Sequence, residues 1–155
     1  RMKPRFSLQR ILELKERKEQ AVAIRLADAR TAAERARELE EEIDRLKQDS
    51  IERRMGAPGA GATVGQLQNT SFVIEKLEQQ LTEARTAVRQ ADVQVNAVLA
   101  EFSIATRERQ VLDRLKEKKR EAAMLEAADA DRKTMDDIAL SRFGRRSQNN
   151  NGSDE

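Results

Sequence analysis

The residues that could do chemistry are few, and their arrangement argues against catalysis. The chain contains no cysteine and no histidine. Zinc sites of the usual ligand sets, Ser-His triads and Cys-His pairs all need at least one of these side chains. The 28 acidic residues are spread over highly charged stretches, and no spacing gathers two carboxylates in a pocket. We therefore expect no enzymatic activity, no metal site and no bound cofactor.

One stretch resembles a phosphate-binding motif. Gly56, Gly61 and Thr63 have the spacing of a P-loop, but Ala62 stands where that motif has the lysine that contacts the phosphates. A highly charged segment precedes the stretch, where a P-loop has a buried strand. Residues 55–69 also hold four of the six glycines and one of the two prolines. We interpret the stretch as the tip between two helices.

The composition predicts long helices on both sides of this tip. Charged residues make up 37% of the 155 residues and aromatics only 3%, with six glycines and two prolines. This profile is typical of long helices, and a net charge of +2 gives no general reason to expect nucleic acid. No apolar run approaches the roughly 20 residues that span a bilayer, so we expect no direct membrane insertion. The absence of cysteine fits a cytoplasmic location.

The clearest pattern lies between residues 74 and 112. Alternate steps of three and four residues meet apolar side chains at eleven of twelve positions, with Arg109 as the exception. A period of 3.5 residues held this long predicts a helix that packs along another in a coiled coil. The positions of this predicted seam are Ile74, Leu77, Leu81, Ala84, Val88, Ala91, Val95, Val98, Phe102, Ala105, Arg109 and Leu112.

A matching seam runs along residues 5–54. It follows Leu8, Leu12, Lys15, Glu19, Val22, Leu26, Ala29, Ala33 and Ala36, and is then predicted to slip onto Leu39, Ile43 and Leu46. Folding the chain back near residue 62 brings the large residues of one seam opposite apolar residues of the other. One layer does not fit, because Lys15 would face Arg109. These two cations weaken the seam unless Glu16, Glu108 or Asp113 neutralises them.

These patterns predict an all-α fold, a long antiparallel two-helix coiled-coil hairpin with a longer second helix. We expect a single hairpin over residues 1–143, with helices at 5–54 and 70–142 and the tip at 55–69. Thr70 or Ser71 would cap the second helix and Gly144 would end it. Residues 144–155 are predicted to be a disordered tail. Residues 120–143 have no partner within such a hairpin.

The surface carries two further signals. Residues 1–25 hold eight basic side chains against three acidic ones, and residues 107–120 hold seven against three, which places both surpluses at the same end of the hairpin. Phe72 lies on the helix face opposite the seam. It either contacts a partner or folds back on Val64 or Leu67, and the basic surplus either serves a partner or has no consequence.

The two ends of the sequence resemble the FliJ family of bacterial flagellar type III export. The resemblance covers most of residues 5–143 and rests on the opening RFSLQRIL at residues 5–12, the closing DRKTMDDIA at residues 131–139, Arg142 and Phe143. It implies a non-enzymatic component of the export apparatus, cytoplasmic and peripherally associated with the inner membrane. Family members are similar to the central stalk of rotary ATPases.

The resemblance also implies partners. Family members insert their terminal end into the hexameric ring of the export ATPase FliI, reach the cytoplasmic domain of the export-gate protein FlhA near the hairpin tip, and bind export chaperones. Carried onto this chain, the FlhA contact involves Phe72, Leu77, Leu81 and Ala84. The ATPase contact involves Phe6, Arg10, Lys15, Arg17, Lys18, Arg109, Arg114, Lys118, Met135, Ile138 and Phe143.

The charge pattern and the resemblance together suggest one mechanism. In it, acidic groups of the ATPase ring neutralise Lys15 and Arg109. Three alternatives stay open. The first is a stalk homologue in a virulence injectisome, the second is a rotor stalk of a true rotary ATPase, and the third is a scaffold in which two hairpins dimerise through their seams. The rotor stalk is least favoured, because such stalks carry a globular portion for which this chain has no room.

Overall fold

The computed structural model describes the backbone of residues 4–56 and 63–151, and the side chains of residues 7–56 and 63–150. Within these residues the chain forms two helices, α1 at Pro4–Gly56 and α2 at Val64–Asn151, and no strand. The predicted all-α fold with a longer second helix is confirmed. The chain divides into two compact units, residues 13–108 and residues 1–12 with 109–155.

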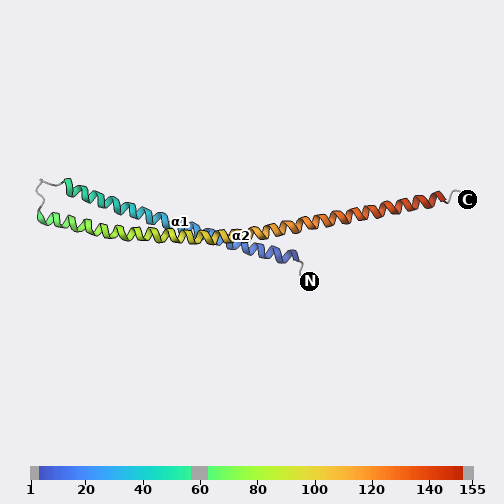
Figure 1. The fold of residues 1–155 in the computed structure, drawn as a ribbon, viewed down its shortest axis with the longest axis horizontal. Helices are drawn as coiled ribbons and strands as arrows, with labels where there is room; N and C mark the ends of the chain where they lie inside the picture. The colour runs from blue at the N-terminus through green and yellow to red at the C-terminus, as the bar shows by residue number, and fades with distance from the viewer. Residues whose placement is uncertain (1–3, 57–62, 152–155) are drawn as a thin grey trace. The chain divides into compact units, whose positions relative to one another are not determined.

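Within residues 13–108 the two helices are antiparallel. Ion pairs join Lys15 to Glu108, Arg25 to Glu101 and Lys47 to Glu78, so the residue numbers on α2 fall as those on α1 rise. In Figure 1 the teal part of α1 and the green part of α2 lie side by side on either side of the connection. These contacts confirm the predicted hairpin.

The buried residues of the described chain all lie on the two predicted seams. They are Leu12, Val22, Leu26, Ala33, Ile74, Leu81, Ala84, Val98 and Ala105. Val22, Leu26 and Val98 form one hydrophobic cluster, against which Val95 and Phe102 pack. Buried aliphatic side chains of both helices, such as Val22 and Leu26 on α1 and Leu81 and Val98 on α2, supply the hydrophobic stabilisation of this seam.

The predicted slip of the α1 seam after Ala36 is wrong. Leu39 and Leu46 are 50% and 49% exposed. The partly buried positions are instead Glu40, Ile43, Lys47 and Ser50, which continue the alternation of three and four without interruption. Long charged side chains can lie along a seam with their aliphatic stems while their charged ends reach partners at its edge.

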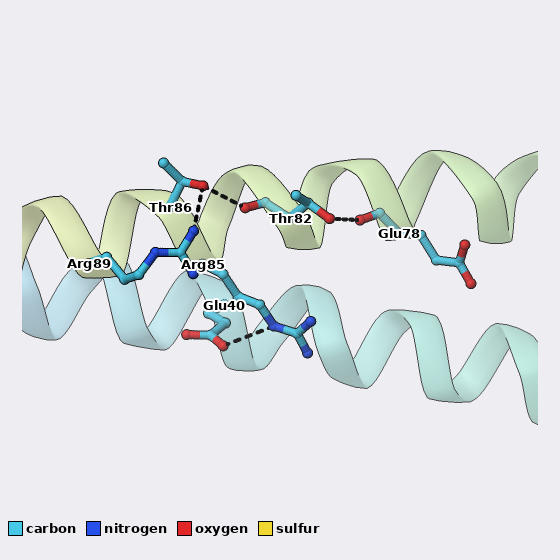
Figure 2. Close-up of polar contacts among 6 residues, drawn as sticks. All are labelled: Glu40, Glu78, Thr82, Arg85, Thr86 and Arg89. Carbon is cyan, nitrogen blue, oxygen red and sulfur yellow. Dashed lines mark hydrogen bonds and ion pairs between the residues drawn. The ribbon is translucent and has the colours of Figure 1, made fainter.

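Figure 2 shows one such contact. Arg85 reaches from α2 to Glu40 on α1, with 3.5 Å between its Nε and a carboxylate oxygen of Glu40. Along α2 itself, Thr82 donates its hydroxyl hydrogen bond to the carbonyl of Glu78, and Thr86 donates to the carbonyl of Thr82. Near the tip, the seam is therefore bordered by polar contacts in which the charges of Arg85 and Glu40 and the hydroxyls of Thr82 and Thr86 have partners.

The second helix begins six residues earlier than predicted, because Thr63 caps it. The backbone N–H of Gln66 donates to the hydroxyl oxygen of Thr63 at 3.2 Å, and the N–H of Thr63 donates to the side-chain oxygen of Gln66 at 3.1 Å. This reciprocal pair is a capping box. Thr70, one of the two predicted caps, lies inside the helix and donates its hydroxyl to the carbonyl of Gln66.

The helix also continues past its predicted end at Arg142. Gly144 does not terminate it, and the described helix extends to Asn151, so residues 144–151 are helical where the sequence predicted a disordered tail. A glycine inside a helix costs only about 1 kcal/mol relative to alanine, and neighbouring turns absorb that cost. Residues 152–155 of the predicted tail and residues 57–62 of the predicted tip lie outside the described residues.

Candidate partner-binding sites

A charged cluster on residues 13–108 involves Lys15, Lys18 and Glu108. The Nζ atom of Lys15 donates a hydrogen bond of 2.9 Å to a carboxylate oxygen of Glu108, and the Nζ of Lys18 lies 3.7 Å from the same oxygen. The hydrogen bond from Lys15, together with the positive charges of both lysines, lowers the pKa of Glu108 below 4.5. Glu108 was one of the three residues expected to neutralise Lys15.

Arg109 belongs to the other unit and has its own partner there. Its Nη1 donates to a carboxylate oxygen of Asp113 at 2.6 Å, one helical turn further along α2. Asp113 was also among the residues expected to neutralise this layer. Lys15 and Arg109 are thus each paired with a carboxylate of this chain, and neither needs an external acid for that purpose.

Other basic residues of the predicted ATPase contact stay exposed. Arg10, Arg114 and Lys118 are exposed in the unit formed by residues 1–12 and 109–155, in which Leu12 is buried. Arg17 is exposed on the other unit. These side chains can meet an acidic surface without first breaking an ion pair of the hairpin seam.

The apolar members of the predicted ATPase contact lie near the end of α2. Met135, Ile138 and Phe143 are all exposed, and so is every residue from Met124 to Asn150. Phe6 lies within α1, and its side chain is outside the described residues. The structure therefore places three large apolar side chains on a stretch of helix that buries none of them.

The predicted FlhA contact does not form one surface. Phe72 is 65% exposed and Leu77 is partly buried, whereas Leu81 and Ala84 belong to the buried seam. A partner that docks on the closed hairpin cannot touch Leu81 or Ala84. Of the four residues, Phe72 is the one that offers most of its surface.

Phe72 instead borders an open hollow of about 380 Å³ near the start of α2. The hollow is lined by Arg54, Val64, Leu67, Gln68, Ser71, Phe72 and Glu75. Val64 and Leu67 are 71% and 43% exposed, and Phe72, itself 65% exposed, lines the hollow together with them. A contact between Phe72 and a partner stays a prediction. The sequence reasoning missed Val64 and Leu67 as site residues because it placed them in the tip. The Thr63-x-x-Gln66 capping signal would have placed both on the helix.

Other kinds of site find little support in the described chain. No group of three acidic, histidine or cysteine side chains among the described residues is placed to hold a metal ion. Nor does the described part contain a helix both long and apolar enough to cross a membrane. What the described surface offers is exposed basic and apolar side chains on two long helices.

The described helices form an antiparallel two-helix coiled coil, which places the chain in the class of all-α helical-hairpin proteins. The family model described as "Flagellar FliJ protein" matches residues 2–148 of the chain. The chain belongs to the FliJ family, and this makes it a component of flagellar type III protein export. Neither a curated protein nor a solved structure matches it.

Proposed function

We propose that the chain is a non-enzymatic export component that inserts residues 1–12 and 109–155 into the ring of the hexameric export ATPase FliI. The observation that carries this proposal is the exposure of the whole stretch from Met124 to Asn150, together with the basic side chains of Arg10, Arg114 and Lys118. A helix with unsatisfied apolar side chains is stabilised by the surface on which it docks.

The basic residues would act by charge complementarity with the ring. Exposed charges accelerate association and fix orientation more than they add affinity, and their effect weakens as salt screens them. The paired state of Lys15 and Arg109 changes the mechanism expected from the sequence. Since both cations are satisfied internally, the exposed Arg114 and Lys118 are the better candidates for contacts with acidic groups of the ATPase. The assignments of Lys15, Arg17 and Lys18 stay predictions from the resemblance.

Charge reversal tests this proposal. The double variant Arg114→Glu/Lys118→Glu should bind the FliI hexamer at least about tenfold more weakly at low salt and lose its stimulation of ATP hydrolysis. A matched control, Arg53→Glu/Lys76→Glu, makes the same change in net charge at two exposed positions of the other unit. The control should retain binding. Equal binding by both double variants at unchanged helicity would reject the ATPase contact.

The same proposal places the contact with the FlhA cytoplasmic domain around Phe72, Val64 and Leu67. These side chains form an exposed apolar group on α2, and a hollow beside them can accept a side chain of a partner. Phe72→Ala should weaken FlhA binding, whereas Val93→Ala, a truncation at another exposed apolar position of α2, should not. Export chaperones are further partners that we assign from the family alone. If Phe72→Ala bound FlhA with the affinity of the parent chain, the proposed contact around Phe72 would be rejected.

A further inference from the structure

The two helices carry charge of the same sign at the open end of the hairpin. Residues 1–12 hold four basic side chains and no acidic one. Residues 109–120 hold six basic side chains and two acidic ones, Asp113 and Glu117. Both segments belong to one compact unit, and we call them the first arm and the second arm. Because the first arm has no carboxylate side chain, it offers no ion-pair partner to the cations of the second arm.

The carboxylates of the second arm do little to change this balance. Asp113 already accepts a hydrogen bond of 2.6 Å from Arg109 within the same arm. Among the described side chains of the two arms, six other basic ones are exposed: Arg10, Arg114, Lys116, Lys118, Lys119 and Arg120. A concentration of one sign of charge in two adjacent segments repels them from each other.

Apolar packing between the arms is short. Leu12 is the one buried residue among the described residues of this unit, and Leu8 and Leu112 are partly buried. The antiparallel order of the two seams brings Leu12 level with Leu112, and brings Leu8 level with Lys116, the next seam position of α2. Lys116 and the seam position after it, Lys119, are both exposed. A single apolar layer, the one that contains Leu12, therefore joins the arms.

The hairpin of residues 13–108 is held together in a different way. Its seam buries apolar side chains of both helices, and ion pairs between the helices border it, such as Lys15 with Glu108 and Arg25 with Glu101. Salt screens attraction and repulsion alike. Added salt therefore weakens the contacts along the edges of this hairpin, whereas it relieves the repulsion between the two arms.

We propose that the two arms form a clasp that opens by charge repulsion and closes when multivalent anions neutralise the cations of both arms. The Debye length is about 30 Å at 0.01 M ionic strength, so repulsion acts across the whole clasp and outweighs the single layer at Leu12. At about 0.15 M the Debye length falls to about 8 Å, and the arms close on Leu12. Residues 13–108 stay paired in both states.

The clasp has a consequence for the ATPase contact, and this consequence rests on the proposed function. An acidic surface that binds Arg114 and Lys118 also reduces the repulsion between the arms. Binding and closure then favour each other, because each lowers the free-energy cost of the other. Opening and closing of the clasp itself depend only on charges of this chain and on anions in solution, so the tests need no partner protein.

Distance measurements between two spin labels test the opening, since the chain has no cysteine of its own. Ser7→Cys/Ala122→Cys places labels on the first arm and just beyond the second, at exposed uncharged positions. Ala32→Cys/Val93→Cys is the control pair within the hairpin. Pulsed electron paramagnetic resonance should find long, broadly distributed distances between the arms at about 0.01 M NaCl and shorter ones at about 0.15 M, with the control pair unchanged. Equal distances between the arms in both solutions would overturn the clasp.

Two lysine replacements in the doubly labelled chain separate seam packing from net charge. Lys116→Leu adds an apolar layer with Leu8 and should raise the ratio of closed to open arms at low salt at least about tenfold. Lys118 lies about 200° around the helix from Lys116, outside the seam. Lys118→Leu removes the same charge there and should raise the ratio less than about threefold. Equal effects of the two replacements would contradict the proposed seam order of the arms.

Sodium sulfate tests closure by anions. At an equal ionic strength of about 0.01 M, sulfate should close the arms more than chloride does, because a divalent anion can neutralise one cation from each arm. At this low concentration the general effect of sulfate on apolar burial is small. Equal arm distances in the two salts would show that screening alone acts, and would overturn closure by multivalent anions. Because FliI is absent from all three experiments, their failure would leave the ATPase proposal standing.

Discussion

Two regions of the same helix, residues 64–108 and 124–150 of α2, are equally helical and differently buried. In the first, apolar side chains recur every 3.5 residues and meet α1, and five of them are buried there: Ile74, Leu81, Ala84, Val98 and Ala105. In the second, no described residue is buried. The difference shows that helicity alone does not indicate which parts of α2 are packed against the rest of the chain. The period of the apolar side chains separates surface used within the chain from surface left for other molecules.

The largest expected effect comes from truncating one leucine in each region. Leu81→Ala removes a side chain that is 2% exposed and should lower the free energy of unfolding by about 2–4 kcal/mol. Leu125→Ala removes one that is 68% exposed and should change it by less than about 0.5 kcal/mol. Urea denaturation followed by circular dichroism measures both.

Comparable losses in the two leucine variants would mean that residues 124–150 are packed within the chain, and the contrast between the regions would fail. The result also affects binding studies. A weaker FlhA interaction in Leu81→Ala would be expected from damage to the hairpin, so it would not identify Leu81 as a contact.

A smaller effect tests the corrected seam near the tip. Lys47 has a side chain that is 22% exposed and lies 3.8 Å from Glu78, whereas its neighbour Leu46 is half exposed. Lys47→Leu places an apolar side chain on the seam and should stabilise the hairpin by about 0.5–1 kcal/mol. Leu46→Ala should cost less than about 1 kcal/mol. If the seam instead slipped onto Leu46, the alanine variant would show the loss of a buried leucine and Lys47→Leu would show no gain.

The smallest effect concerns the pH dependence of Glu108. Because its pKa is lowered from 4.5, the folded form binds fewer protons at this site than the unfolded form, and the site stabilises the hairpin above pH 4.5. That contribution disappears as the pH falls through the lowered pKa. The difference in urea midpoint between the parent and Glu108→Gln should therefore be present at neutral pH and vanish in more acidic solution. Glu83→Gln, at an exposed position of the same helix, is the matched control.

If the difference in urea midpoint between the parent and Glu108→Gln did not change with pH, the carboxylate would act through its shape and not its charge. The expected effect is small, because exposed ion pairs are screened by water and salt.

The sequence was sufficient for the α2 seam, since all of its positions from Ile74 to Leu112 are buried or partly buried. It misled near the tip of α1, where leucine is the natural candidate for a seam and the structure uses Glu40 and Lys47. A long charged side chain lies along a seam only where the other helix has an oppositely charged partner at the matching position along its length. Arg85 and Glu78 are such partners, and their positions depend on the tertiary register.

The candidate sites were predictable to different extents. Charge counts found the basic surplus, but only coordinates separate Lys15 and Arg109, which have carboxylate partners, from the exposed Arg114 and Lys118. Phe72 was recognised as exposed from its place opposite the seam. Its neighbours Val64 and Leu67 were not, because an N-terminal cap at Thr63 competes with equally plausible caps at Thr70 and Ser71.

Two charged residues on the α1 seam near the tip, Glu40 and Lys47, have a consequence for alignment. Glu40 faces Arg85 and Lys47 faces Glu78, so the signs alternate from one heptad to the next. A slip by one heptad in one direction would bring Glu40 to Glu78, and a slip in the other would bring it to Asp92. Either error sets like charges against one another. The two pairs therefore disfavour a slip of one heptad in either direction along a seam whose alanine-rich heptads are otherwise similar.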